Sequence, residues 1–309
     1  MDASATHLTL RTGASMPMVG LGTWQSAPRQ VGQAIEYALT QCGYRHIDCA
    51  SIYGNEREIG KSLGKVLRDG HVQRENIFIT SKLWNNAHRE NLVRGACEQT
   101  LRDLQLEYLD LYLMHWGLAS SPESLEAMDA DGNLVIDKVP IRETWEAMEE
   151  LVGAGLVKAI GVANFTAPLL LDLFSYARIQ PAVNQIEMHP YLQQTRLLDF
   201  CQRLGMVVTA YSPLARPGYE EMSARLVDEK VIREIASAHG KTPAQVLLRW
   251  GIQRNTVVIP KSTHPERIKE NIDVFDFELS ESDMHAIAGL ERGLRIVDPY
   301  QWGQIPYFD

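Results

Sequence analysis

Short apolar runs alternate with longer amphipathic stretches along most of the chain. The runs, each short enough for one buried strand, occupy residues 19–22, 45–48, 77–82, 109–115, 157–162, 182–186, 207–211 and 256–259. Stretches with apolar residues every three or four positions occupy residues 30–41, 56–68, 90–104, 141–152, 168–177, 195–204, 228–250 and 265–271. Because short apolar runs are typical of buried strands and the longer period is typical of helices, this pattern predicts repeated strand–helix units around a parallel sheet.

Repetition of this unit over the whole chain predicts a closed (β/α)8 TIM barrel. An open doubly wound sheet is disfavoured, because no GxGxxG motif follows the first apolar run. A chain of 309 residues is long for one domain, yet α/β barrels reach this length around a single core. We therefore interpret residues 1–309 as one barrel domain, with extra helices outside the repeat.

Three segments fall outside the strand–helix repeat. Residues 8–17 alternate around Thr12 and Gly13, which predicts an N-terminal β-hairpin across the floor of the barrel. Residues 117–140 form a long loop rich in Ser, Asp and Gly, and residues 292–309 form a tail. Since loops and tails on a rigid barrel usually carry selectivity, we expect the tail to contribute to a substrate pocket.

The composition restricts the partners of the protein. A formal net charge of -9 disfavours nucleic acids and anionic membrane surfaces. The N-terminus lacks the apolar core of a signal peptide, and no apolar run approaches the ~20 residues of a membrane span. The 4 cysteines form no CxxC pair, which suits free thiols in a reducing compartment. We expect a cytoplasmic protein, a monomer or weak homodimer, that acts on a small molecule.

Polar residues stand at the ends of three successive predicted strands. Asp48 ends the second run and Tyr53 follows five residues later, while Lys82 ends the third run and His115 the fourth. Side chains at the C-terminal ends of barrel strands point into the mouth, where barrel enzymes carry out their chemistry. Neighbouring strands would therefore bring the four side chains into one cluster.

Such a cluster is suited to protonating a carbonyl oxygen. The Tyr53 hydroxyl, with an ordinary pKa of about 10, needs a cation to stabilise its phenolate, and Lys82 supplies one. Asp48 would keep Lys82 charged, and His115 would orient the carbonyl by a hydrogen bond. Taken singly, these residues also fit a helix cap, packing or a solvated surface. Their joint occurrence favours a catalytic site.

Two further groups of residues suggest ligand contacts. Lys261, Ser262 and Arg267 follow the eighth run, where barrels often bind phosphate at a helix N-terminus. An ordinary capped surface helix is the alternative interpretation. Aromatic side chains available to line a substrate pocket, or simply to pack in the core, are Trp24, Trp116, Tyr300 and Trp302.

The motifs of the chain resemble those of the aldo-keto reductase family. In order along nearly the whole sequence they are GLGTWQS, GYRHIDCASIYGNEREIG, LDLYLMHW, GVANF, AVNQIEMHPYLQQ, TAYSPL and IPKSTHPERIKEN. PIRETWEAMEELV and the tail DPYQWGQIPYFD resemble xylose and aldose reductases, and WGIQRNTVVIPKS also resembles plant aldose-6-phosphate reductases.

The resemblance implies roles for individual residues. It makes Tyr53 the general acid, tuned by Asp48 and Lys82, with His115 positioning the carbonyl. It implies an extended NADPH cofactor without a Rossmann domain, with NADH as a weaker alternative. Its implied cofactor contacts are Asn164 and Gln185 to the carboxamide, Tyr211 to the nicotinamide ring, Ser212 and Leu214 to the pyrophosphate, Lys261, Ser262 and Arg267 to the 2′-phosphate, and Glu270 and Asn271 to the adenine.

Two positions depart from the family pattern. Ala163 stands where many relatives have a serine that helps to hold the carboxamide, which implies weaker cofactor binding. Val297 stands where xylose reductases have an asparagine, which removes a hydrogen-bond partner for a sugar hydroxyl. A sugar phosphate would need cations near the mouth, for which Arg216, Arg292 and Arg295 are candidates.

The predicted function is NADPH-dependent reduction of an aldehyde or open-chain aldose, including a sugar phosphate, to the alcohol by direct hydride transfer. The alternative on the same fold is a cofactor-binding regulatory or structural protein with little turnover. No metal is expected, because the sequence lacks the His-x-His ligand pairs that metal-dependent barrel hydrolases commonly use.

Overall fold

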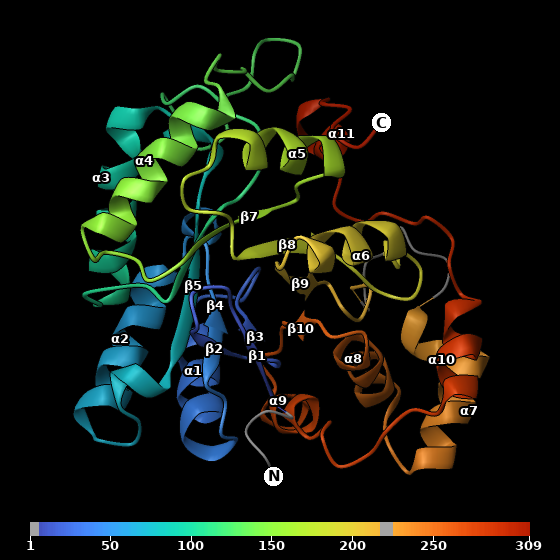
Figure 1. Ribbon diagram of the computed structural model, residues 1–309. Helices are drawn as coiled ribbons and strands as arrows, with labels where there is room; N and C mark the ends of the chain where they lie inside the picture. The colour runs from blue at the N-terminus through green and yellow to red at the C-terminus, as the bar shows by residue number, and fades with distance from the viewer. Residues whose placement is uncertain (1–5, 217–224) are drawn as a thin grey trace.

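Eight parallel strands form the centre of the molecule (Figure 1). The computed structural model describes residues 6–216 and 225–309. The strands are β3 (Leu21–Gly22), β4 (His46–Asp48), β5 (Phe78–Leu83), β6 (Leu111–Met114), β7 (Ile160–Ala163), β8 (Val183–Glu187), β9 (Val207–Tyr211) and β10 (Val257–Val258). Each strand pairs with the next in chain order, which confirms the predicted parallel arrangement.

Backbone contacts between the first and last strands close the sheet into a barrel. Val19 forms a parallel bridge with Val258, and Gly22 forms one with Lys261. A side chain is excluded at Gly22, because a Cβ atom there would lie 2.7 Å from the carbonyl oxygen of Ile259. The closure confirms the (β/α)8 fold expected from the repeated pattern.

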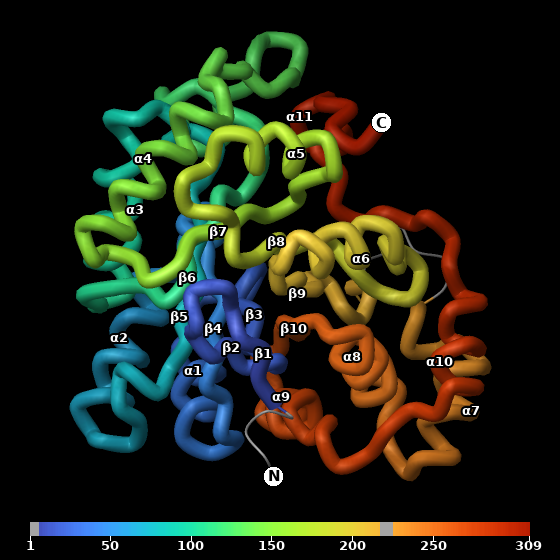
Figure 2. Tube along the Cα trace, viewed as in Figure 1, coloured from blue at the N-terminus to red at the C-terminus, as the bar shows by residue number. Residues whose placement is uncertain are grey.

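Helices surround the barrel on its outside, as the tube in Figure 2 shows. The α-helices are α1 (Gln30–Gln41), α2 (Glu56–Arg68), α3 (Glu90–Leu104), α4 (Ile141–Gly153), α5 (Ala167–Tyr176), α6 (Thr195–Arg203), α7 (Lys230–His239), α8 (Pro243–Gln253), α9 (Pro265–Ile272), α10 (Glu281–Ala288) and α11 (Pro299–Gly303). Short 3-10 helices are η2 (Ser51–Tyr53), η3 (Arg74–Asn76), η4 (Asn85–Ala87) and η5 (Leu226–Asp228). In the part of the chain that the structure describes, no helix has the length and apolar character needed to cross a bilayer.

The long helix predicted at residues 228–250 is wrong, because the chain forms two helices there. Gly240 adopts a left-handed conformation (φ 61°) that ends α7. Thr242 then caps α8 in a capping box with Gln245, and Pro243 occupies the first turn, where its missing N–H costs no hydrogen bond. The apolar period continues through this break, which is why periodicity alone did not reveal it.

The N-terminal hairpin is present as predicted. Strands β1 (His7–Thr9) and β2 (Ser15–Pro17) pair antiparallel. Leu10 and Met16 of the hairpin are buried in a cluster with inward-facing barrel residues such as Leu111 and Val257. The hairpin therefore supplies apolar side chains that fill the interior of the barrel at one end.

Candidate active site

A buried lysine joins the residues predicted to form the catalytic cluster. Nζ of Lys82 donates hydrogen bonds to Oδ1 of Asp48 (2.6 Å), to the carbonyl oxygen of Cys49 (2.7 Å) and to the hydroxyl of Tyr53 (3.4 Å). The side chains of Lys82 and Asp48 are 0% and 3% exposed. The ends of β4 and β5 thus bring a carboxylate, an ammonium and a phenol together away from water.

Local hydrogen bonds place Tyr53 next to Lys82. Tyr53 ends the short helix η2, and Oγ of Ser51 in that helix donates to the carbonyl oxygen of Lys82 (3.2 Å). Nδ2 of Asn55 donates to the carbonyl oxygen of Thr23 (2.9 Å). The Thr23 hydroxyl in turn donates to the backbone carbonyl oxygen of Asp48 (2.8 Å). The loop after β4 is therefore held against both neighbouring strands, β3 and β5.

The charges of the cluster follow from burial and pairing. Burial acts to lower the pKa of Lys82, but the combined effect of Asp48, Tyr53 and Cys49 is larger and holds that pKa above its ordinary value of 10.5. Burial raises the pKa of Tyr53 to about 12, and Lys82 opposes this only in part. The expected effect of Lys82 on Tyr53 is therefore present, but desolvation outweighs it, and the pKa of Tyr53 stays above its ordinary value.

His115, at the end of β6, is neutral at physiological pH. Burial lowers its pKa well below the ordinary 6.5, and the positive charge of Lys82 acts in the same direction. Its ring lies edge-on to those of Tyr53 (6.0 Å between centroids) and Trp84 (5.1 Å). Within the described residues, Nδ1 of this histidine has no hydrogen-bond partner.

The residues predicted to hold a nicotinamide adjoin the cluster. Nε2 of Gln185 donates to Oδ2 of Asp48 (2.8 Å), so both oxygens of that carboxylate are bonded. Asn164, in a left-handed conformation (φ 62°), donates to the carbonyl oxygen of His115 (3.0 Å) and accepts from the hydroxyl of Tyr211 (2.8 Å). These amides therefore form a layer that continues from the cluster across β7, β8 and β9.

The predicted phosphate contacts lie between β10 and α9. The Ser262 hydroxyl is bonded to the backbone N–H of His264 (3.1 Å), just before α9 begins. Lys261 and Arg267 are exposed, and neither forms an ion pair with any residue that the structure describes. Two unpaired cations beside a hydroxyl and a helix N-terminus suit a dianionic phosphate group. The residues present therefore fit a phosphorylated dinucleotide.

The remaining predicted cofactor residues occupy the surrounding loops. Ser212 continues from β9 in a left-handed conformation (φ 49°), and Leu214 is half-buried two residues later. The carboxylate of Glu270 accepts a hydrogen bond from the Thr242 hydroxyl (2.5 Å), while Asn271 is buried in α9. Glu270 is thus fixed by α8 as well as by its own helix.

An aromatic cluster lies above His115. Trp116 packs against Trp302 (5.9 Å between centroids), Tyr307 (5.2 Å) and Phe308 (6.0 Å). Trp84 bridges from His115 to Trp302 (6.2 Å), which places the tail over the predicted catalytic residues. The tail and the long loop also meet directly, since the hydroxyl of Tyr307 accepts from the backbone N–H of Gly117 (3.0 Å).

Two of the predicted pocket residues lie outside this aromatic cluster. Tyr300 is 59% exposed, and none of the ring contacts among the described residues involves it. The guanidinium of Arg216 lies over the ring of Trp24, with 4.3 Å between its Cζ atom and the ring centroid. Sequence reasoning missed Trp84, Tyr307 and Phe308, although Trp84 follows Lys82 by two residues at the same strand end.

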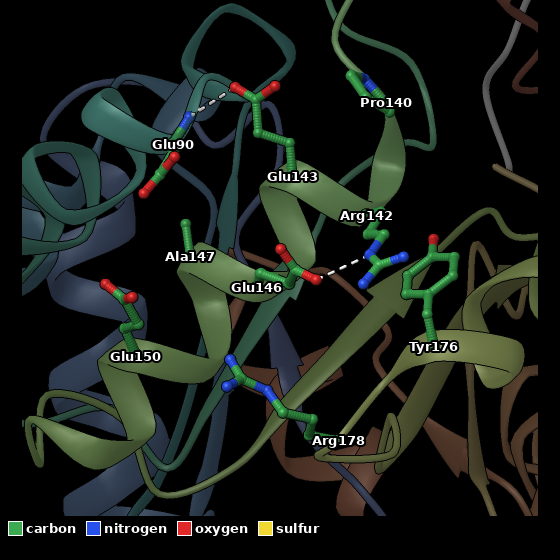
Figure 3. A pocket seen from close by; sticks show the side chains of 9 residues that line it. All are labelled: Glu90, Pro140, Arg142, Glu143, Glu146, Ala147, Glu150, Tyr176 and Arg178. Atoms are coloured by element: carbon green, nitrogen blue, oxygen red, sulfur yellow. Dashed lines mark hydrogen bonds and ion pairs between the residues drawn. The ribbon is translucent and has the colours of Figure 1, made fainter.

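A surface groove lies away from the predicted site, on the outer face of α4 (Figure 3). Its volume is about 560 Å³, and the lining residues are Glu90, Pro140, Arg142, Glu143, Glu146, Ala147, Glu150, Tyr176 and Arg178. The ion pair of Arg142 with Glu146 (2.8 Å) lies along α4 among these lining residues. None of the predicted site residues lines this groove.

Behind Lys82, a second buried carboxylate gives a testable pH dependence. Glu56 accepts hydrogen bonds from Ser81 (2.6 Å) and Thr100 (3.1 Å), yet burial raises its pKa from 4.5 to about 7. The folded protein therefore binds this proton more tightly than the unfolded chain. The resulting stabilisation is complete below pH 4.5 and lost as the pH rises to about 7, on the order of 3 kcal/mol.

Urea unfolding of the wild type and Glu56→Gln at about pH 5 and about pH 8 measures this effect. We expect the variant to gain stability relative to the wild type as the pH rises. Other buried groups also contribute to the pH dependence of stability, such as His46 and His88, because burial lowers the pKa of each to about 4. Their contributions are the same in both proteins and cancel in the difference. An equal difference at both pH values would show that Glu56 does not titrate in this range.

Comparisons with known proteins identify the family of the chain. The Aldo/keto reductase family profile matches residues 18–292. Aldo-keto reductase family 1 member A1-A of Danio rerio is 50% identical over 297 residues, which cover 94% of this chain and 91% of that protein. Aldose reductase B of Dictyostelium discoideum is 49% identical over 301 residues, or 95% of each chain.

A solved structure shares the whole fold. The aldose reductase from Schistosoma japonicum superposes with a TM-score of 0.92 at 44% sequence identity, covering 98% of this chain and 97% of that one. These matches confirm the resemblance found in the motifs. The chain therefore belongs to the aldo/keto reductase family of oxidoreductases, whose members generally use NADP(H).

Proposed function

We propose that this protein reduces the carbonyl group of an aldehyde or open-chain aldose to the alcohol with NADPH, and that Tyr53 donates the proton. The observation that carries the proposal is Lys82, fully buried between the Asp48 carboxylate and the Tyr53 hydroxyl. Family membership supports carbonyl reduction, and the relative named aldose reductase B supports an aldose among the substrates.

The pKa of Tyr53 suits a proton donor in this reaction. At about 12, the phenol stays protonated at physiological pH. Hydride addition to a carbonyl carbon generates an alkoxide, whose conjugate acid is about as weak an acid as water and far weaker than a phenol. Proton transfer from Tyr53 to that oxygen is therefore favourable. Lys82 stabilises the phenolate that remains, because Asp48 keeps its ammonium charged.

His115 and the aromatic side chains prepare the carbonyl for this step. A neutral imidazole donates one hydrogen bond to the substrate oxygen without competing with Tyr53 for its proton. Trp84 and Trp116 are 9% and 3% exposed and limit the access of water to the oxygen. The tail, through Trp302, completes the wall of this pocket on our proposal.

The amide layer next to the cluster is proposed to hold the nicotinamide. Asn164 and Gln185 would bind its carboxamide, and the half-buried ring of Tyr211 would stack on it. When bound, NADPH supplies the hydride. Ala163 provides no hydroxyl at the end of β7, so carboxamide binding depends on the two amides.

Lys261 and Arg267 are proposed to select NADPH over NADH, with Ser262 as a third contact. NADH lacks the 2′-phosphate that these cations would bind. In Arg267→Ala we expect the KM for NADPH to rise about 10- to 100-fold, because one charge-assisted hydrogen bond is lost. The KM for NADH should change less than about threefold. Steady-state kinetics with both cofactors measure this.

Lys269 provides the matched control for this experiment, because it is an exposed cation on the same helix. Lys269→Ala should leave both KM values nearly unchanged. Equal losses for NADPH and NADH in Arg267→Ala would contradict phosphate recognition by Arg267.

The placement of the arginines bears on sugar phosphates as substrates. Arg292 is paired with Glu229 (2.5 Å), and Arg216 stacks on Trp24. The guanidinium carbon of Arg295 lies 3.5 Å from the ring centre of Phe308 in the aromatic cluster. Of the three arginines, Arg295 is therefore the best placed to bind the phosphate of a sugar phosphate. Kinetics with simple aldehydes, xylose and hexose 6-phosphates under both cofactors test the substrate class. Absence of turnover with the whole set would contradict the proposed function.

We place this activity in the cytosol, where NADPH is available. The 4 cysteines of the chain are all free, which suits a reducing compartment. The expected partner is the small carbonyl substrate alone, bound by a monomer or weak homodimer. Size-exclusion chromatography coupled to light scattering tests the oligomeric state.

A further inference from the structure

A fully buried carboxylate attaches the C-terminal tail to the barrel. Glu187, the last residue of β8, accepts hydrogen bonds from the backbone N–H of Ile296 (2.8 Å) and of Val297 (2.9 Å). Nε2 of His189 donates a third (2.9 Å), and both side chains are 0% exposed. Ionised carboxylates are rarely buried unless such bonds replace their hydration. These contacts are therefore an integral part of the fold.

The attachment point adjoins the proposed nicotinamide site. Glu187 pairs with Tyr211 in the register of β8 and β9. Burial raises the pKa of Tyr211, and the charge of Glu187 acts in the same direction. Gln185, two residues earlier on β8, points to the same face of the strand and contacts Asp48. The tail is thus attached at the same level of the barrel mouth as the predicted cofactor residues.

The pocket-forming part of the tail comes directly after the attachment point. Val297 is followed by α11, which carries Trp302 onto Trp84 and Trp116. In Figure 1 this segment runs in red from α10 up to α11. Upstream, the carbonyl oxygen of Tyr191 accepts from the backbone N–H of Leu294 (3.0 Å), which fixes the approach of the chain. A shift at residues 296–297 would therefore move the aromatic wall.

We propose that Glu187 is a positioning residue that sets substrate selectivity by fixing the tail against the end of β8. The selectivity part rests on the proposed reductase function, whereas the attachment itself does not. Glu187 touches the tail rather than the substrate, so its loss should loosen the pocket wall and leave the proton-donating cluster in place.

The test compares Glu187→Gln with Glu149→Gln. A glutamine at 187 keeps the shape but puts an NH₂ donor opposite one of the two tail N–H groups. Glu149 is a matched control, because it is also buried and also accepts from two backbone N–H groups, those of Arg178 (2.7 Å) and Ile179 (2.8 Å). The segment that contains Arg178 and Ile179 connects α5 to β8.

Amide hydrogen exchange of a peptide that begins several residues before Ile296 and reaches residue 304 tests the attachment without any turnover. We expect exchange at Ile296 and Val297 to accelerate about 10- to 100-fold in Glu187→Gln and to stay at the wild-type rate in Glu149→Gln. Wild-type exchange rates in Glu187→Gln would overturn the attachment. Glu187→Asp, which keeps the charge but shortens the reach, should change in the same direction and replaces the glutamine variant if that one does not fold.

Kinetics then test selectivity. In Glu187→Gln we expect the KM for a bulky aromatic aldehyde to rise about tenfold relative to propanal, with kcat and the Kd for NADPH within about threefold of the wild type. Faster tail exchange with unchanged relative KM values would overturn the selectivity role. Failure of the wild type to reduce any carbonyl would instead contradict the proposed function and leave the exchange result standing.

Discussion

Replacing Tyr53 with phenylalanine is expected to lower kcat for aldehyde reduction by about 10²- to 10⁴-fold, the usual contribution of a general acid. The variant removes only the hydroxyl, which is 3.4 Å from Nζ of Lys82. The Lys82–Asp48 pair and the aromatic cluster keep their other contacts, so the Kd for NADPH should stay within about threefold of the wild type. Steady-state oxidation of NADPH by a reactive aromatic aldehyde, together with a cofactor titration, measures both quantities.

Tyr112 provides the matched control for that variant. It is also fully buried, on β6, but its hydroxyl has no hydrogen-bond partner among the residues that the structure describes. Its side chain packs with the outer core between barrel and helices, away from the inner cluster that contains Leu111 and Leu113. Tyr112→Phe should leave kcat unchanged. An equal loss in both variants would indicate a general effect of core perturbation.

Asp48→Asn is expected to lower the free energy of unfolding by about 3–5 kcal/mol and to abolish most of the activity. The substitution leaves the Lys82 ammonium buried without its counter-charge, and an uncompensated buried charge is costly. Lys82 would then lose its proton or draw water into the site, and in both cases it no longer stabilises the Tyr53 phenolate. Urea unfolding and NADPH oxidation measure the two losses.

A double variant separates stability from catalysis in this pair. Asp48→Asn combined with Lys82→Met removes both charges, so most of the lost stability should return while the activity stays low. Asp103→Asn is the control, since its partner Arg57 is 79% exposed and surface pairs contribute less than about 1 kcal/mol. Recovery of activity in the double variant would contradict the role of Lys82.

The barrel and the position of the proposed catalytic cluster were predictable because both follow from local pattern. Apolar runs identified the strands, and the C-terminal ends of consecutive parallel strands must lie side by side. Asp48, Lys82 and His115 therefore meet although they are far apart in the sequence. The helix break at Gly240 and the position of α10 were not predicted. Both depend on capping residues, and the spacing of apolar residues does not reveal a helix cap.

The aromatic cluster and the attachment of the tail were predicted less well because they depend on contacts that have no local signal. Glu187 bonds to residues 109 and 110 positions away, and nothing in the sequence indicates that pairing. Trp302 joins the aromatic cluster, whereas Tyr300 is exposed. Side chains that are two positions apart on a helix point in different directions. The net pKa of Tyr53 was not predictable from the sequence either, because the cost of burying a phenolate depends on the completed fold.

A single-turnover experiment tests most directly whether Tyr53 supplies the proton. Wild type and Tyr53→Phe, each loaded with NADPH, are mixed rapidly with a reactive aromatic aldehyde, and the loss of the reduced nicotinamide is followed. We predict that the rate of the first turnover falls at least about 100-fold in the variant although the amount of bound NADPH is the same. A first-turnover rate within about threefold of the wild type would show that another group protonates the carbonyl.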